Sequence, residues 1–244
     1  MQTAHAIEQS VFLKAEWRNL VMLNYEIEPS ILTQWLPKGT ELDYFKGRTY
    51  VSVIAFQFLH ARVMGMSIPL HRDFEEVNLR FYVRRQDGDE VRRGVVFVNE
   101  VVPRRAIAWV ARGLYSERYK AMPMMHSVSG PADQLEVEYR WRPLEHWSYV
   151  RAKMASPFAP LQSGTFNHFI AEHFWGYAQR EGETVEYAVE HPSWRVAPVE
   201  QYSLEIDIEP LYGAEFVETL SGKPYSVFMA EGSEVSVHRG RLLE

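Results

Sequence analysis

Lys120 is the residue whose setting first suggests chemistry in this sequence. It lies in the stretch 111–124, ARGLYSERYKAMPM, among tyrosines, methionines and two arginines. A lysine surrounded by apolar groups and other cations loses affinity for its proton, and the neutral amine can then form an imine with a carbonyl compound. A lysine on a surface turn, with its ammonium in water, fits the same stretch. Both interpretations stay open from the residues themselves.

Four polar side chains alternate along the segment 74–85, FEEVNLRFYVRR. Glu76, Asn78, Arg80 and Tyr82 occupy every second position, and apolar residues lie between them. In a β-strand such residues share one face. This face either meets water or lines a polar interior. In an interior, Glu76 and Arg80 must compensate each other or bind a ligand, because an unpaired buried charge is costly.

The aromatic segment 168–177, HFIAEHFWGY, is a third candidate and carries Glu172 and Trp175. Large aromatic side chains most simply pack a core, but they also form the walls of pockets that hold apolar ligands. His168 and His173 are five residues apart, whereas two ligands on one helix face need a spacing of three or four. We therefore predict no metal site and expect these histidines to be hydrogen-bonded core or surface residues.

The motifs of several large enzyme classes are missing from the sequence. It contains no GxxxxGK[ST], no GxGxxG after a strand, no GxSxG and no HExxH. Nucleotide hydrolysis, dinucleotide redox chemistry, serine hydrolysis and zinc-dependent proteolysis therefore lose their usual support. We predict that the protein uses no cofactor.

The composition of the chain further limits which class of protein it can be. The 244 residues include no cysteine, 46% are hydrophobic, and the formal net charge is -6. The lack of cysteine excludes disulfides and thiolate chemistry and is consistent with a reducing compartment. The negative charge argues against sequence-independent binding of nucleic acid, and no apolar stretch is long enough to span a bilayer. We expect a cytoplasmic protein that binds neither nucleic acid nor membranes.

Period-two alternation predicts strands along most of the chain. They are expected at 21–27, 49–58, 74–85, 92–102, 135–141, 184–191, 202–208, 225–231 and 233–239. Asp87-Gly88 predicts a hairpin between the third and fourth of these strands. Helices are expected from about Pro29 to Leu36, from Ala106 to Tyr115 and over 211–220, LYGAEFVETL. The second of these helices would lead the chain into Lys120.

These elements predict a mainly β protein, a β-rich α+β fold with a few short helices. Many antiparallel strands favour a curved or closed sheet around an internal cavity, because closure removes exposed edges. The same strand pattern continues past the Ser-Gly-Pro at 129–131, so residues 1–244 are predicted to form a single domain.

Several motifs together resemble the YqjF-like family, which is grouped with the acetoacetate decarboxylase-like superfamily. The motifs are EWRNLVMLNYEI, LPKGTELDYFKGRTYVSV, FEEVNLRFYVRR, RRGVVFVNEVVPRRAIAWVARGLY, EHFWGY, VEHPSW and MAEGSEV. They cover nearly the whole chain. The resemblance implies a curved, largely antiparallel sheet around an internal cavity.

The resemblance also implies positions for site residues. In acetoacetate decarboxylases a Pro-Lys-Lys segment follows a short helix, and its first lysine forms the imine. The similar segment here is RYK, 118–120, which places Tyr119 at the imine-forming position and Lys120 at the helper position; a shift of one residue would make Lys120 the nucleophile. Glu76 corresponds best to a family glutamate. One lysine and the proline are missing, so we predict that the protein does not decarboxylate acetoacetate.

Three functions are compatible with these observations. The first is binding of a small apolar or carboxylate-bearing molecule, with Arg80 or Lys120 as the anchor of the acid. The residues expected to contribute to this ligand site are Arg80, Asn78, Tyr82, Tyr115, Glu172 and Trp175. The second is a lyase, or a related carbon-carbon or proton-transfer enzyme, using Lys120 with Glu76 and Tyr119. The third is a structural or interaction protein with a filled core. A homo-oligomer is compatible with all three.

Overall fold

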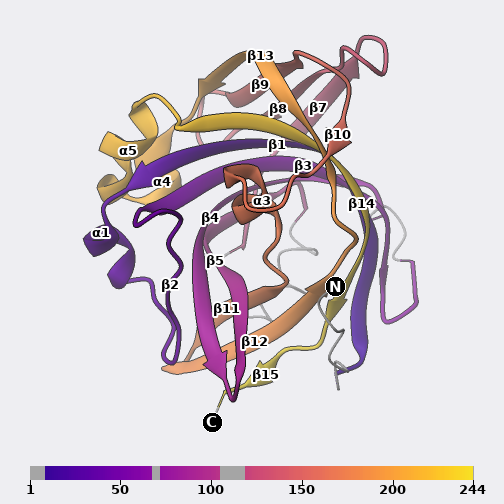
Figure 1. Ribbon diagram of the computed structural model, residues 1–244. Helices are drawn as coiled ribbons and strands as arrows, with labels where there is room; N and C mark the ends of the chain where they lie inside the picture. Colours follow the sequence, from indigo (N-terminus) through magenta and orange to yellow (C-terminus); the bar gives the residue numbers. More distant parts are fainter. Residues whose placement is uncertain (1–8, 68–71, 105–118, 244) are drawn as a thin grey trace.

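Most of the chain forms one large, strongly curved sheet (Figure 1). The computed structural model describes residues 9–67, 72–104 and 119–243. The long strands of the sheet are β1 (Val11–Ile27), β3 (Thr49–Val63), β4 (Phe74–Asp87), β5 (Glu90–Val102), β13 (Arg195–Glu205) and β14 (Ser226–His238). The shorter ones are β7 (Met124–Ser129), β8 (Glu136–Trp141), β9 (Ser148–Met154), β11 (Trp175–Arg180) and β12 (Glu183–Glu190), with the minor strands β2 (Glu41–Leu42), β6 (Tyr119–Ala121), β10 (Ala159–Pro160) and β15 (Arg241–Leu242).

The strand order explains the curvature. The path runs β15-β12-β11-β5-β4-β3-β1-β14-β13-β9-β8-β7, and β12 also pairs with β14 through Val189 and Val237. This additional pairing brings strands from separate parts of the path together, so the sheet bends back on itself. Most pairs are antiparallel, as predicted, whereas β5 pairs in parallel with both β6 and β11. The predicted mainly β fold with a curved sheet is confirmed.

The predicted hairpin is present between β4 and β5. Asp87 lies opposite Glu90, and Gly88 has a φ of 59° in the turn. This left-handed conformation costs glycine nothing, which explains the Asp-Gly signal at this turn.

Three predictions of element boundaries are wrong. The strand expected over 202–208 ends at Glu205 in β13, and Ile208 already belongs to the next helix. The strands expected at 225–231 and 233–239 form one continuous strand, β14, in which Gly232 has a φ of 80° and approaches the carbonyl of Trp17 on β1. A glycine within a strand therefore allows close approach of two backbones here instead of marking a break. The helix expected over 211–220 is divided into α4 (Ile208–Tyr212), a 3₁₀ turn (Ala214–Phe216) and α5 (Val217–Ser221), because Gly213 has a φ of 108°.

The other helices are short. The predicted helix at Pro29 is α1 (Pro29–Thr33), which is shorter than expected, and α3 (Phe166–Ala171), which overlaps the start of the aromatic segment, was not predicted. In α3 the hydroxyl oxygen of Thr165 accepts a hydrogen bond from the His168 amide, which caps the first turn. The helix predicted over Ala106–Tyr115 lies outside the described residues.

The sheet has two packed faces, and alternation along β4 assigns residues to them. Val77 and Leu79 belong to one core, which includes Tyr139, Trp141 and Phe216. The opposite face is packed by a second cluster, whose members include Ile54, Phe56, Phe58, Tyr82 and Phe169. Glu76, Asn78 and Arg80 lie on this second face, so the polar residues of β4 point toward the interior of the curve.

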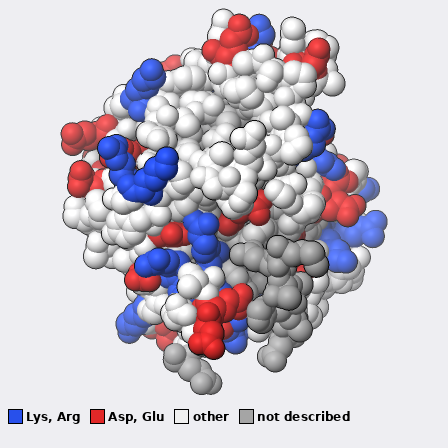
Figure 2. All heavy atoms as spheres, viewed as in Figure 1, with Lys and Arg blue, Asp and Glu red and all other residues white. Residues whose placement is uncertain are grey.

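Charge is distributed without a large basic area on the face shown in Figure 2. Blue and red residues lie close together around its margin, and much of its middle is uncharged. In the described part of the chain, no helix is long and apolar enough to cross a membrane. The same residues contain no group of three or more histidine, aspartate or glutamate side chains placed to hold a metal ion.

Candidate functional site

An internal cavity of about 160 Å³ lies within the curve of the sheet. Its described lining comes from β1, β3, β4, β5, β6, β11, β12, β14, α3 and the segments that follow α3 and β12, and it is largely apolar. The aromatic walls include Trp17, Phe56, Phe58, Phe97, Trp175 and Trp194. Walls of this kind suit a mostly apolar molecule, whose orientation is then fixed by a few polar groups.

The polar face predicted from the alternation along β4 lines this cavity. Glu76, Asn78 and Arg80 are all on its wall and are only 3%, 2% and 8% exposed. The amide nitrogen of Asn78 donates a hydrogen bond to Glu76 Oε1 at 3.0 Å. The interior interpretation of this face is therefore the correct one, and the solvated interpretation is wrong for these three residues.

A second carboxylate and a phenol join Glu76 on the wall. Glu100 on β5 lies in the β-ladder opposite Asn78 and next to Tyr119, and both Glu100 and Tyr119 line the cavity. Burial raises the pKa of Glu76 to about 7, against the lowering effects of hydrogen bonds from Asn78 and Tyr119 and of the Arg80 charge. Burial also raises the pKa of Tyr119 well above its ordinary value, and the Glu100 and Glu76 carboxylates raise it further. The phenol of Tyr119 is therefore a hydrogen-bond donor to a carboxyl group that titrates near neutral pH.

Arg80 is the cation of the cavity wall. One terminal nitrogen of its guanidinium donates to the Ile170 carbonyl at 3.2 Å, and the group lies 5.6 Å from the centre of the Tyr82 ring. Its Nε has no hydrogen-bond partner among the described residues. A donor remains available on this buried charge.

Tyr82 supports Arg80 and is not among the described lining residues of the cavity. Its hydroxyl is 2.6 Å from Ser52 Oγ, and Ser52 in turn donates to Asn24 Oδ1 at 2.6 Å. This chain of hydrogen bonds crosses three neighbouring strands. It fixes the ring against which Arg80 lies.

A buried histidine and aspartate form a feature that the sequence analysis missed. His173 lines the cavity with a fully buried side chain, and its Nε2 is 3.2 Å from Asp43 Oδ2. Arg93 also donates to this oxygen, at 2.6 Å. Burial is the main cause that lowers the pKa of His173 to about 4, which keeps the ring neutral at physiological pH. Because 130 residues separate the partners, no local spacing could have revealed this pair.

The structure separates Lys120 from these residues. In β6 the neighbouring Tyr119 points to the cavity, whereas the ammonium of Lys120 donates to the carbonyls of Pro210 and Leu211, each at 3.1 Å. Partial burial lowers its pKa. The sequence analysis places this side chain in one site with Glu76, Tyr119 and Arg80. Adjacent residues of a strand point to opposite faces, and that expectation is wrong for Lys120.

The remaining candidates occupy different places. Trp175 lines the cavity, while Glu172 is half-buried beside it, between Ala171 and His173. Tyr115 lies outside the described residues. The guanidinium of Arg92 stacks over the Trp175 ring at 4.2 Å, a geometry that stabilises a cation against an aromatic face.

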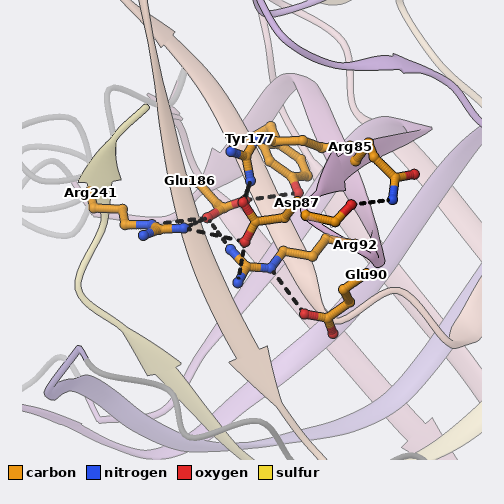
Figure 3. A network of polar contacts seen from close by, with 9 residues as sticks. Arg85, Asp87, Glu90, Arg92, Tyr177, Glu186 and Arg241 are labelled. Atoms are coloured by element: carbon orange, nitrogen blue, oxygen red, sulfur yellow. Dashed lines mark hydrogen bonds and ion pairs between the residues drawn. The ribbon is translucent and has the colours of Figure 1, made fainter. Parts of the chain in front are cut away.

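Arg92 links the cavity wall to a buried ionic network. Figure 3 shows Glu186 at its centre, contacted by Arg85, Arg92, Arg241 and Tyr177. The Glu186 carboxylate is fully buried and lies 3.2, 2.8 and 2.9 Å from the three guanidinium groups, in that order. Asp87 pairs with Arg85 at 2.9 Å, which adds a second negative charge to the cluster. The network joins β4, β5, β12 and β15 below the cavity.

The fold is that of the acetoacetate decarboxylase-like proteins. An acetoacetate decarboxylase from Legionella pneumophila matches with a TM-score of 0.64 and 13% identity, covering 100% of this chain and 92% of that chain. The enduracididine biosynthesis enzyme MppR, in a structure with HEPES buffer bound, matches with a TM-score of 0.66 and 12% identity, covering 99% of this chain and 91% of that chain. At these identities the likeness concerns the fold.

The chain belongs to the DUF2071 family, described as "Uncharacterized conserved protein (COG2071)", which matches residues 14–234. The uncharacterized protein YqjF of Bacillus subtilis is 22% identical to it over 183 residues, which cover 75% of this chain and 74% of that protein. The resemblance drawn from the sequence motifs is thereby confirmed.

Proposed function

We propose that this protein binds a small, mostly apolar molecule with one polar end in the cavity. The observation that carries the proposal is the convergence of buried polar residues on one aromatic-walled space. Proteins commonly bind small ligands in pockets with this combination of apolar walls and a few fixed polar groups. A cavity of about 160 Å³ is comparable to an engineered cavity of about 150 Å³ that admits benzene. A structural protein with a filled core would have no need of such a space.

Solved structures with the same fold support this proposal. MppR has been observed in complex with pyruvate, in a structure that matches with a TM-score of 0.64 and 12% identity. The support is limited to the architecture, because the identity is low.

Titration with toluene, followed through the fluorescence of the cavity tryptophans Trp17, Trp175 and Trp194, tests the proposal. We expect a saturable change. Ala171 on the cavity wall supplies a blocking variant, Ala171→Leu, and the buried Ala152 of β9, which is not among the described lining residues, supplies the matched control Ala152→Leu. Saturation lost in the first variant and kept in the second supports the site. An unsaturable response in the unaltered protein contradicts it.

Proton transfer is a second candidate function, and the pKa of Glu76 near 7 is the observation that favours it. A carboxyl group that titrates near the working pH can both accept and donate a proton. Tyr119 would stabilise the developing oxyanion of a carbonyl substrate by turning its one O–H from Glu76 to the substrate oxygen, because its phenol stays protonated. This proposal uses Glu76 and Tyr119 from the predicted catalytic set and does not use Lys120.

Exchange of the α-hydrogens of cyclohexanone in D₂O, followed by proton NMR, tests the second candidate. Exchange above the buffer rate should be lost in Glu76→Gln. It should persist in Glu75→Gln, since Glu75 is the preceding residue of β4 and is bonded to His126, away from the cavity lining. Equal rates with and without the protein would remove this candidate.

A further inference from the structure

Several buried polar atoms of the residues that line the cavity have no hydrogen-bond partner among the described residues. One is the indole Nε1 of Trp17 on β1, and three others, Arg80 Nε, His173 Nδ1 and Asn78 Oδ1, lie on β4 and the segment after α3. Arg80, His173 and Asn78 are each more than nine-tenths buried. A buried polar group without a partner destabilises a protein, so three of them on one part of the wall indicate a ligand that completes them.

The hydrogen-bonding role of each atom is fixed by what the rest of its side chain does. Arg80 Nε is a donor because a guanidinium has no acceptor. His173 donates through Nε2 to Asp43, so its Nδ1 is an acceptor. Asn78 donates through its amide nitrogen to Glu76, so Oδ1 is an acceptor. These three atoms therefore offer one donor and two acceptors.

These atoms are held close together. Asn78 and Arg80 are two residues apart on the same face of β4. Arg80 and His173 both lie against the Tyr82 ring, because the Arg80 guanidinium is 5.6 Å from its centre and the His173 ring centre is 4.8 Å from it. The three residues therefore border one part of the cavity, where the polar group of a bound molecule would lie.

We infer that this polar group is a primary carboxamide carried on an apolar ring or chain. The inference rests on the proposed binding function and names its ligand class. A carboxamide presents one carbonyl acceptor, which suits Arg80 Nε, and two N–H donors, which suit His173 Nδ1 and Asn78 Oδ1. The aromatic walls contact the apolar part of the molecule.

Charged alternatives fit less well. A carboxylate would pair with Arg80 but has no hydrogen to give to His173 or Asn78, and it would be placed on the same wall as Glu76 and Glu100. An ammonium group has no acceptor for Arg80 and would be repelled by its charge. The inference therefore selects an uncharged head over the carboxylate that the sequence analysis had considered.

Three probes of similar shape test this inference: benzamide, benzoate and toluene. We expect benzamide to bind at least about tenfold more tightly than toluene, and benzoate to bind less tightly than benzamide. Toluene that binds as tightly as benzamide, or benzoate that binds most tightly, overturns the inference while leaving the proposed binding function intact. Failure of all three to bind contradicts both.

Two variants locate the effect. His173→Phe and Asn78→Leu each remove one acceptor and put an apolar side chain of similar size in its place, so each should reduce the ratio of benzamide affinity to toluene affinity about tenfold. Asn99→Leu is the matched control, because Asn99 is equally buried but donates to the Leu211 carbonyl and is not among the cavity residues. Equal loss of both probes in the cavity variants would show a merely structural role and overturn the inference. If either variant fails to fold, the three-probe comparison on the unaltered protein still decides.

Discussion

Glu76 should make the stability of this protein depend on pH near neutrality. Its pKa is raised from an ordinary value of 4.5 to about 7 by burial. Between these values the carboxyl group stays protonated in the folded protein but ionises in the unfolded chain, so the unfolded chain binds fewer protons. The free energy of unfolding therefore falls as pH rises from 4.5 to about 7. The stabilising contribution is complete below pH 4.5 and lost above pH 7, and the pKa difference corresponds to roughly 3 kcal/mol.

Glu76→Gln removes this titration and keeps the shape of the side chain. The variant should gain stability relative to the unaltered protein as pH rises, by roughly 2.5 kcal/mol more at pH 8 than at pH 5. Denaturation by urea at pH 5, 6, 7 and 8 measures the free energy of unfolding of both proteins. The contributions of the other titrating groups are common to both and cancel in the difference. Glu75→Gln is the control, because the pKa of Glu75 is lowered and its carboxylate is ionised throughout this range. A Glu76→Gln difference that stays constant from pH 5 to pH 8 would refute the reasoning.

Three further predictions concern residues outside the cavity wall. Glu186→Ala should lower the free energy of unfolding by about 3–5 kcal/mol, because three arginines would lose the buried carboxylate that they share. A loss under 1 kcal/mol in urea denaturation would contradict this. Gly232→Ala should destabilise the folded protein by roughly 1–3 kcal/mol more than Gly65→Ala. Both glycines have a φ of 80°, but a Cβ at position 232 would lie 1.9 Å from the Trp17 carbonyl oxygen, whereas a Cβ at position 65 would meet nothing within 4 Å. Equal melting temperatures of the two variants would rule out the clash. Borohydride reduction with pyruvate or acetoacetate should leave Lys120 unmodified in peptide mass analysis, because its ammonium is committed to two backbone carbonyls, and a covalent adduct at Lys120 would show otherwise.

Local sequence patterns predicted the parts of this structure that depend on local geometry. Alternation in 74–85 assigned Glu76, Asn78 and Arg80 to one face, and the Asp-Gly pair predicted the hairpin that follows. The interior placement of that face depends on how the whole sheet curves, which is set by pairings such as β12 with β14. Alternation could not decide that point.

The parts that the sequence did not reveal depend on contacts between distant segments. Asp43 and His173 meet only because β4, β5 and the segment after α3 converge on the same side of the sheet. Gly232 serves a close approach to β1, which is invisible without the register of the two strands. Lys120 was placed in the site from its neighbours in the chain and from the family resemblance, whereas its direction is set by the parallel pairing of β6 with β5.

The pairing of β6 with β5 has a consequence for how this fold could change its chemistry during evolution. Tyr119 lies next to Glu100 in the ladder and Lys120 next to Val101. A slip of β6 by one residue would reverse the two faces and bring the lysine amine to the wall that carries Glu76 and Glu100, without any substitution of a side chain. A single insertion or deletion ahead of the strand would be enough to make such a slip. A cavity that carries an amine and one that carries a phenol thus differ by one inserted or deleted residue, with no change in the type of any side chain.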